Sequence, residues 1–92
     1  MTPPRVSVVL PVRNAAETIE RSARSILDST LRELELLVID DGSADNSAAI
    51  IRQISDPRVR LFQKDALGVC AAANRGTAEA RATVIARMDA DD

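Results

Sequence analysis

The feature that most restricts the fold is an alternation of short apolar runs, rich in β-branched residues, with longer segments of helical character. The apolar runs span 6–12, 34–39, 58–63 and 83–88. The segments between them, amphipathic or rich in alanine, span 15–27, 44–54 and 68–82. Runs of this length and composition are typical of buried strands. Their alternation with helices predicts an α/β fold with a doubly wound, mostly parallel sheet and helices on both faces.

Local signals suggest where the helices begin. Asn14 is the expected N-cap of the first helix, and Ser43 is the expected N-cap of a second helix that starts at Ala44. Gly42 permits the turn before that helix. Asp56-Pro57 is expected to end it, because proline disfavours helical angles in the residue before it.

Size and composition narrow the class of protein. The chain has 92 residues, which predicts one small domain, or part of one, over 1–92. The net charge of −2 and the scattered basic residues argue against nucleic acid as a partner. Cys70 is the single cysteine and there is no histidine, which predicts no internal disulfide, no cysteine–histidine catalytic pair and a cytoplasmic protein. The sequence leaves open whether the full-length protein works at the cytoplasmic face of a membrane.

Two acidic clusters follow the second and fourth predicted strands. They are Asp40-Asp41 and Asp89-Ala90-Asp91-Asp92. Ligands of open parallel sheets bind outside the carboxyl ends of the strands, so a strand order of 3-2-1-4 would place both clusters in one crevice beside residues 11–14. Asp89 and Asp91 lie two residues apart and would point the same way on an extended chain, as paired ligands for Mg²⁺ or Mn²⁺. Such ions usually complete their shell with phosphate oxygens, which predicts a diphosphate-bearing ligand.

A purely structural interpretation stays open for each cluster. Acidic residues are common at strand ends, where they cap helices and remain solvated. Of the first pair, Asp40 is the stronger candidate for such a structural role.

Four segments together resemble the successive motifs of family 2 glycosyltransferases with the GT-A fold. They are VSVVLPVRN, LLVIDDGSADNS, LGVCAAANRG and ARMDADD, in this order, between Val6 and Asp92. The resemblance implies the Rossmann-like nucleotide-diphospho-sugar transferase fold, here ending just after the metal motif. It also implies transfer of a sugar from a nucleotide diphosphate donor, most simply a UDP-sugar, to an acceptor hydroxyl with inversion, assisted by Mg²⁺ or Mn²⁺.

The same resemblance assigns roles to individual residues. Donor-binding residues would be Pro11, Val12, Arg13, Asn14, Glu17, Asp40, Asp41, Arg75, Asp89 and Ala90. Among these, Asp41 would accept from the base edge with Asp40 in support, and Asp89 would contact the ribose or the water shell of the metal. Asp91 would ligate the metal. The general base would lie downstream of Asp92.

Arg75 belongs to an Asn74-Arg75-Gly76 motif that the family has at the donor side. A solvent-exposed charge on the helix is an equally good interpretation of this residue.

Two other functions are consistent with aspartates at strand ends. A receiver-type signalling module binds Mg²⁺ there, although it should carry a lysine on a later strand and the chain has only Lys64. The chain could also be a truncated fragment that folds without activity. Truncation would leave the outer edge of the fourth strand unpaired, which predicts a homodimer or higher association through that edge.

Overall fold

A computed structural model describes residues 3–64 and 68–88 of the chain. In chain order the elements are β1 (Val6–Val12), α1 (Ile19–Leu27), β2 (Leu34–Asp41), α2 (Ser47–Arg52), β3 (Val59–Lys64), α3 (Val69–Glu79) and β4 (Val84–Arg87). The predicted alternation of strands and helices is therefore confirmed.

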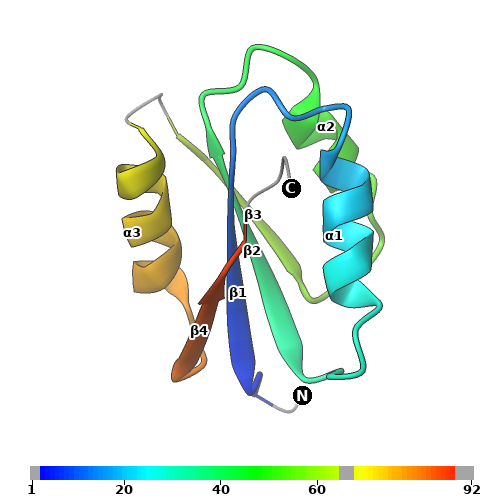
Figure 1. Cartoon of the computed structure of the whole chain (residues 1–92), viewed down its shortest axis with the longest axis vertical. Helices are drawn as coiled ribbons and strands as arrows, with labels where there is room; N and C mark the ends of the chain where they lie inside the picture. Colours follow the sequence, from blue (N-terminus) through cyan, green and yellow to red (C-terminus); the bar gives the residue numbers. More distant parts are fainter. Residues whose placement is uncertain (1–2, 65–67, 89–92) are drawn as a thin grey trace.

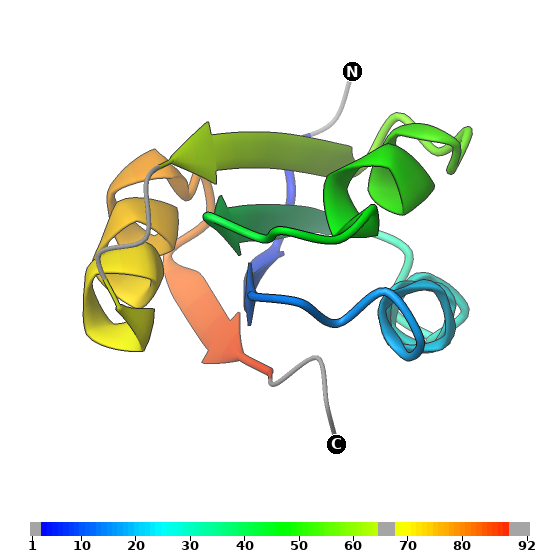
Figure 2. The same cartoon turned by 90° about the horizontal axis from the view of Figure 1, so that it is seen from above.

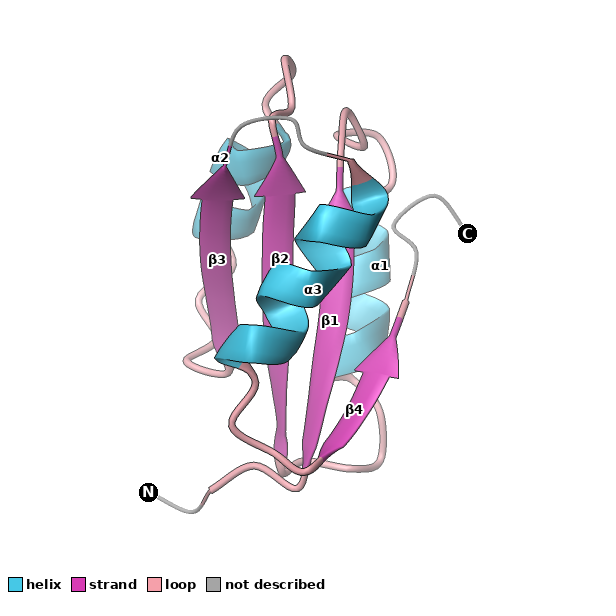
Figure 3. Ribbon diagram, turned by 90° about the vertical axis from the view of Figure 1, so that its left-hand side faces the viewer, coloured by secondary structure: helices cyan, strands magenta, loops and turns pink. Residues whose placement is uncertain are grey.

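The strands form one parallel sheet in the order β3-β2-β1-β4. Helices α1 and α2 cover one face, and α3 covers the other (Figures 1 and 2). Figure 3 shows all strands pointing the same way, with α3 crossing in front of β1 and β2. Both the doubly wound architecture and the predicted strand order are confirmed. The order reverses beside β1, which has β2 on one side and β4 on the other.

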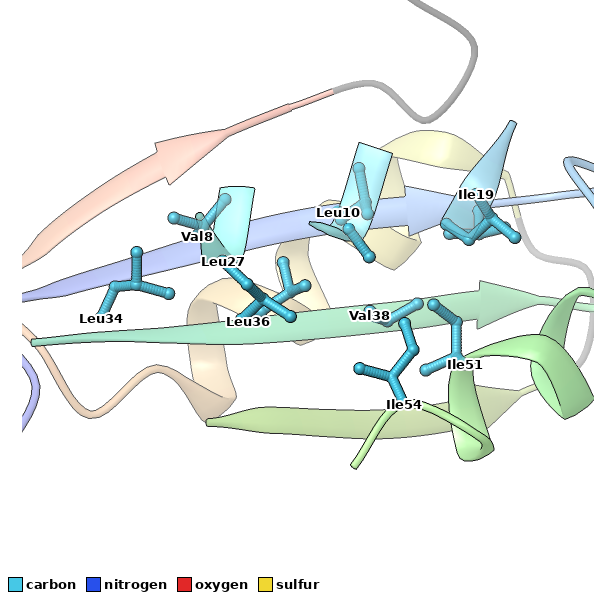
Figure 4. Packing of buried hydrophobic residues seen from close by; sticks show 11 residues of the cluster. Val8, Leu10, Ile19, Leu27, Leu34, Leu36, Val38, Ile51 and Ile54 are labelled. Carbon is cyan, nitrogen blue, oxygen red and sulfur yellow. The ribbon is translucent and has the colours of Figure 1, made fainter. Parts of the chain in front are cut away.

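The core consists of two apolar layers, because successive side chains of a strand point to opposite faces. Val8 and Leu10 of β1 face α1 and α2, in a cluster that includes Leu36 and Ile51 (Figure 4). Val9 faces α3, in a smaller cluster whose other buried members are Leu37, Ile39 and Ala72. Both faces of β1 and β2 are buried, which explains why these strands appear in the sequence as nearly continuous apolar runs.

A buried polar network joins the strands near their amino ends. One carboxylate oxygen of Glu35 accepts from Ser7 Oγ at 2.6 Å and from the Arg81 amide at 2.7 Å, and the other accepts from Arg60 at 3.0 Å. Ser7 Oγ in turn accepts from the Ala82 amide at 3.0 Å. These bonds attach the connection between α3 and β4 to the first three strands.

The helices begin later than the sequence predicts. Helix α1 starts at Ile19 with Thr18 as its N-cap, and α2 starts at Ser47 with Asn46 as its N-cap, so the N-cap roles expected for Asn14 and Ser43 are wrong. Asn14 adopts a positive φ of 53°, outside any helix. The reason is that both side chains bond across to the neighbouring loop, as described below.

Strand β4 is one of the two edge strands of the sheet in the described part of the chain, opposite β3. It pairs with β1 alone there, and two of its apolar side chains are exposed: Val84 at 57% and Ile85 at 38%. Helix α3 also leaves Cys70 exposed. None of the described helices combines the length and the hydrophobicity needed to cross a membrane.

Candidate functional site

The carboxyl ends of β1 and β2 bring two predicted segments together. Val12 lies in register with Asp40, so the end of the first motif is adjacent to the start of the acidic pair. Pro11 and Val12 are buried, whereas the Arg13 side chain that follows them is exposed. At this edge, then, the first motif presents mainly the backbone after Val12 and the side chains of the loop that follows.

Asn14 and Ser43 join the two loops reciprocally. The Asn14 amide donates to Ser43 Oγ at 2.9 Å, and the Ala44 amide donates to Asn14 Oδ1 at 2.7 Å. The positive φ of Asn14 is a conformation that asparagine tolerates better than most residues. The loop after β1 therefore has a defined geometry that depends on the loop after β2.

Asp45 and Ser47 extend this connection toward α1. The Ala15 amide donates to Ser47 Oγ at 3.0 Å, and the Ala16 amide donates to Asp45 Oδ2 at 3.1 Å. The Ser47 amide donates to Asp45 Oδ1 at 3.0 Å, and the Ser47 hydroxyl donates to the same oxygen. The hydroxyl bond from Ser47 is the main reason that the pKa of Asp45 lies below its usual value. Asn14, Ser43, Asp45 and Ser47 are called the cross-loop network below.

Asp45 and Ser47 are not among the site residues predicted from the sequence. A local signal was present, because aspartate commonly accepts from the backbone amide two residues later. The bonds to Ala15 and Ala16, more than 25 residues away in the sequence, had no such signal.

Asp40 and Asp41 are both buried, with 5% and 3% of their surface exposed, and they point to opposite faces of the sheet. Asp40 Oδ1 accepts from the Ser43 amide at 3.0 Å and stabilises the turn in which Gly42 has a φ of 75°. Asp41 Oδ2 accepts from the Gly68 amide at 3.0 Å, at the start of α3. The structural role expected for Asp40 matches this geometry, and Asp41 lies on the α3 side.

Two other predicted donor residues, Glu17 and Arg75, lie outside the cross-loop network. Glu17 is exposed in the loop before α1. Arg75 pairs with Glu79 at 3.0 Å, and its guanidinium lies 5.2 Å from the centre of the Phe62 ring. Arg60 lies at the same distance from that ring. Arg75 therefore packs against β3 and its own helix in this structure, and its role at the donor stays a prediction.

The predicted metal motif cannot be described in the same way, since Asp89, Ala90 and Asp91 lie outside the described residues. Over 3–64 and 68–88, no group of three or more Asp, Glu, Cys or His side chains is arranged to hold a metal ion. This agrees with Asp40 and Asp41 facing opposite sides and bonding to backbone amides. The last described residue, Met88, donates its amide to Val9 O at 3.0 Å, beside β1.

Comparison with known proteins gives one family. Residues 7–92 match the family described as Glycosyl transferase family 2. The chain is 35% identical over 97% of its length to a chondroitin synthase of Pasteurella multocida, and 39% identical over 95% to the Escherichia coli UDP-Glc:alpha-D-GlcNAc-diphosphoundecaprenol beta-1,3-glucosyltransferase WfgD. It spans only 9% and 35% of the length of these two relatives.

Solved structures give the same fold. The mannosyltransferase PcManGT of Pyrobaculum calidifontis, solved in complex with GDP-Man and Mn²⁺, superposes with a TM-score of 0.82 at 27% identity, over 98% of this chain and 28% of that one. S. aureus TarS superposes with a TM-score of 0.86 at 24% identity, over 96% of this chain and 28% of that one.

Proposed function

The chain belongs to glycosyl transferase family 2 and has the GT-A α/β fold, and from this premise we propose that it forms the donor-binding part of an inverting, metal-dependent glycosyltransferase. The donor is a nucleotide diphosphate sugar and the acceptor a hydroxyl group. The observation that carries the proposal is the junction of β1 and β2, where Val12 lies in register with Asp40 at the carboxyl edge of a parallel sheet. Parallel sheets bind nucleotides at this edge, where the strand order reverses.

We assign the nucleotide to the two loops that follow these strands. The backbone from Pro11 to Arg13 and the side chain of Asn14 contact the base and ribose from one side. Asp41 accepts from a ring N–H of the base, since a carboxylate oxygen accepts N–H donors, as it does from the Gly68 amide. Asp40 supports the site indirectly by stabilising the turn at Gly42.

The metal would be held by Asp91, with Asp89 at its water shell or the ribose. Carboxylates are the hard oxygen donors that Mg²⁺ and Mn²⁺ prefer, so the donor set fits either ion. When bound, such an ion neutralises the charge that develops on the departing nucleoside diphosphate. The Mn²⁺ in the mannosyltransferase complex supports a divalent ion here. The general base that takes the acceptor proton is proposed to lie outside these 92 residues.

Three finer proposals accompany this function. The nucleotide is UDP, as for the UDP-Glc enzyme of Escherichia coli, although the mannosyltransferase neighbour was solved with GDP-Man. The protein acts in the cytoplasm, consistent with its single cysteine. Two copies associate through β4, whose Val84 and Ile85 are exposed at an edge. The family match argues against the receiver-type signalling module.

Calorimetry with UDP and GDP, each with and without Mn²⁺, tests the assignment on the unmodified chain and on Asp91→Ala. We expect tighter binding with Mn²⁺ and loss of that dependence in the variant. Glu33→Ala, an exposed carboxylate removed at the opposite end of the sheet, is the matched control and should bind as the unmodified chain does. Binding that ignores both the ion and the Asp91 substitution would overturn the site assignment.

A further inference from the structure

We infer that Asp45 and Ser47 are positioning residues for the donor nucleotide: they hold the loop after β1 in its binding geometry without touching the ligand. The inference rests on the proposed function and adds two residues to it. It is carried by the bonds from Ala15 to Ser47 and from Ala16 to Asp45.

The position of these bonds along the chain gives them their effect. Val12 is fixed by the sheet, and Asn14 to Ala16 are fixed one after another by the cross-loop network. Arg13 is the single residue between the two fixed points. The backbone proposed to contact the nucleotide is therefore held at both ends. At the far end Asn14 bonds to Ser43 and Ala44, and the next two residues, Ala15 and Ala16, bond to Ser47 and Asp45.

The two residues differ in how they are held. Ser47 is buried at the first turn of α2, which packs on the sheet through Ile51, so its hydroxyl is a fixed point. Asp45 is exposed and is oriented by the amide and the hydroxyl of Ser47. Ser47 thus positions Asp45, and together they bond to the two amides before α1.

The energetic consequence follows from preorganisation. Ala15 and Ala16 precede α1, so their amides lie outside the helix and obtain partners here from the other loop. Without those partners the loop samples other conformations, and the apparent dissociation constant rises by the inverse of the fraction that stays competent. If about one molecule in ten keeps the binding geometry, affinity falls about tenfold.

The test compares two aspartates with similar local bonds. Asp45 and Asp56 each accept from the backbone amide two residues later. Asp56 lies before β3, at the opposite end of the sheet, and also pairs with Arg58. UDP and GDP affinity with Mn²⁺ and the thermal midpoint by circular dichroism are measured for Asp45→Ala, Asp45→Asn, Ser47→Ala and Asp56→Ala.

We expect Asp45→Ala and Ser47→Ala to weaken nucleotide binding about tenfold at temperatures where all the variants are folded. Asp45→Asn keeps one acceptor oxygen and should fall between Asp45→Ala and the unmodified chain. Asp56→Ala should lower the thermal midpoint and leave the affinity unchanged. Amide hydrogen exchange without ligand should speed up at Ala15 and Ala16 in Asp45→Ala and Ser47→Ala, and stay slow in Asp56→Ala.

The outcomes separate the two proposals. If the unmodified chain binds neither nucleotide, the proposed function is refuted, and the inference with it. If it binds and all variants bind equally, or if affinity follows the thermal midpoint in Asp56→Ala as well, the inference alone is refuted. Unchanged exchange at Ala15 and Ala16 would also overturn it, because the loop would then be held by other contacts.

Discussion

Replacing Gly76 by alanine tests how closely α3 packs on β1. A Cβ at position 76 would overlap Cγ1 of Val9 and would lie 3.1 Å from its Cγ2 and 3.3 Å from its Cβ. Val9 is completely buried in the middle of the sheet, and its branched side chain has few alternative rotamers. The clash is relieved only if helix or strand moves.

The expected cost is the difference between two opposing effects. Overpacking a dense core costs about 1–3 kcal/mol, while exchanging glycine for alanine within a helix gains about 1 kcal/mol. Gly76→Ala should therefore lower the free energy of unfolding by about 0–2 kcal/mol. Val9→Ala alone should cost about 2 kcal/mol through lost burial and a cavity. In the double variant the new methyl group fills part of that cavity, so the two costs should not add, with a coupling of about 1 kcal/mol or more.

Urea unfolding followed by far-ultraviolet circular dichroism measures all three variants, since Phe62 is the single aromatic residue and intrinsic fluorescence is weak. Gly68→Ala is the matched control. Its φ of 101° is unfavourable for alanine, yet nothing lies within 4 Å of a Cβ there. It should cost about 1–3 kcal/mol and show no coupling to Val9.

Two results would refute this reasoning. If Gly76→Ala stabilises the chain, helix propensity exceeds the clash and α3 is not closely packed on β1. If its effect simply adds to that of Val9→Ala, the two positions do not share the same space. The expected coupling would show that the Asn74-Arg75-Gly76 motif has glycine at its third position because α3 packs closely on β1, and no contact to the donor would be needed to account for it.

Three other predictions concern charge and association. Burial raises the pKa of Glu35, but its hydrogen bonds outweigh that effect and hold the pKa below the ordinary 4.5. The ionised carboxylate should therefore stabilise the fold above about pH 4.5, and this stabilisation should be lost as the pH falls through the lower pKa of the folded state. Urea midpoints of the unmodified chain and of Glu35→Gln, measured from about pH 7 to pH 3, should converge at the acid end. Glu35→Ala removes the partner of a largely buried pair and should cost about 3 kcal/mol at neutral pH, whereas an effect below that of Asp56→Ala would contradict the network at the amino ends. Val84→Lys at the exposed edge should convert an associated chain to monomer in light scattering, and an unmodified chain that is already monomeric at high concentration would contradict the homodimer.

Much of the fold could be predicted because its determinants are local. The run 6–12 is apolar at nearly every position, which requires cover on both faces, and β1 does lie between two helical layers. The strand order followed from the usual arrangement of doubly wound sheets. The turn at Gly42 followed from its neighbours, and its φ of 75° bears this out.

The loops were predicted less well because their bonds are long-range. Asn14 and Ser43 are good capping residues by type, and nothing in the local sequence shows that they bond to each other's loops. Cys70, expected from its type to be a small buried residue of the third helix, is exposed, because its burial depends on which face of α3 the sheet covers. The roles of Asp89 and Asp91 stay predictions, since these residues lie outside the described part of the chain.

The roles proposed for Asp41 and Asp45, ligand contact and positioning, can be separated by experiment. The buried carboxylate of Asp41 holds the start of α3 through Gly68, so removing it should lower the stability of the fold along with nucleotide affinity. Asp45 is exposed, and in the described part of the chain it bonds to Ala16 and to Ser47 at the start of α2, so removing it should affect affinity far more than stability. The choice of nucleotide base distinguishes the two residues further. Asp41→Asn replaces one acceptor oxygen that faces the base by an NH₂ donor, and it should change the preference between UDP and GDP. Asp45→Ala should lower the affinity for UDP and for GDP by the same factor, because it reduces the fraction of molecules whose loop is in the binding geometry, whichever base binds.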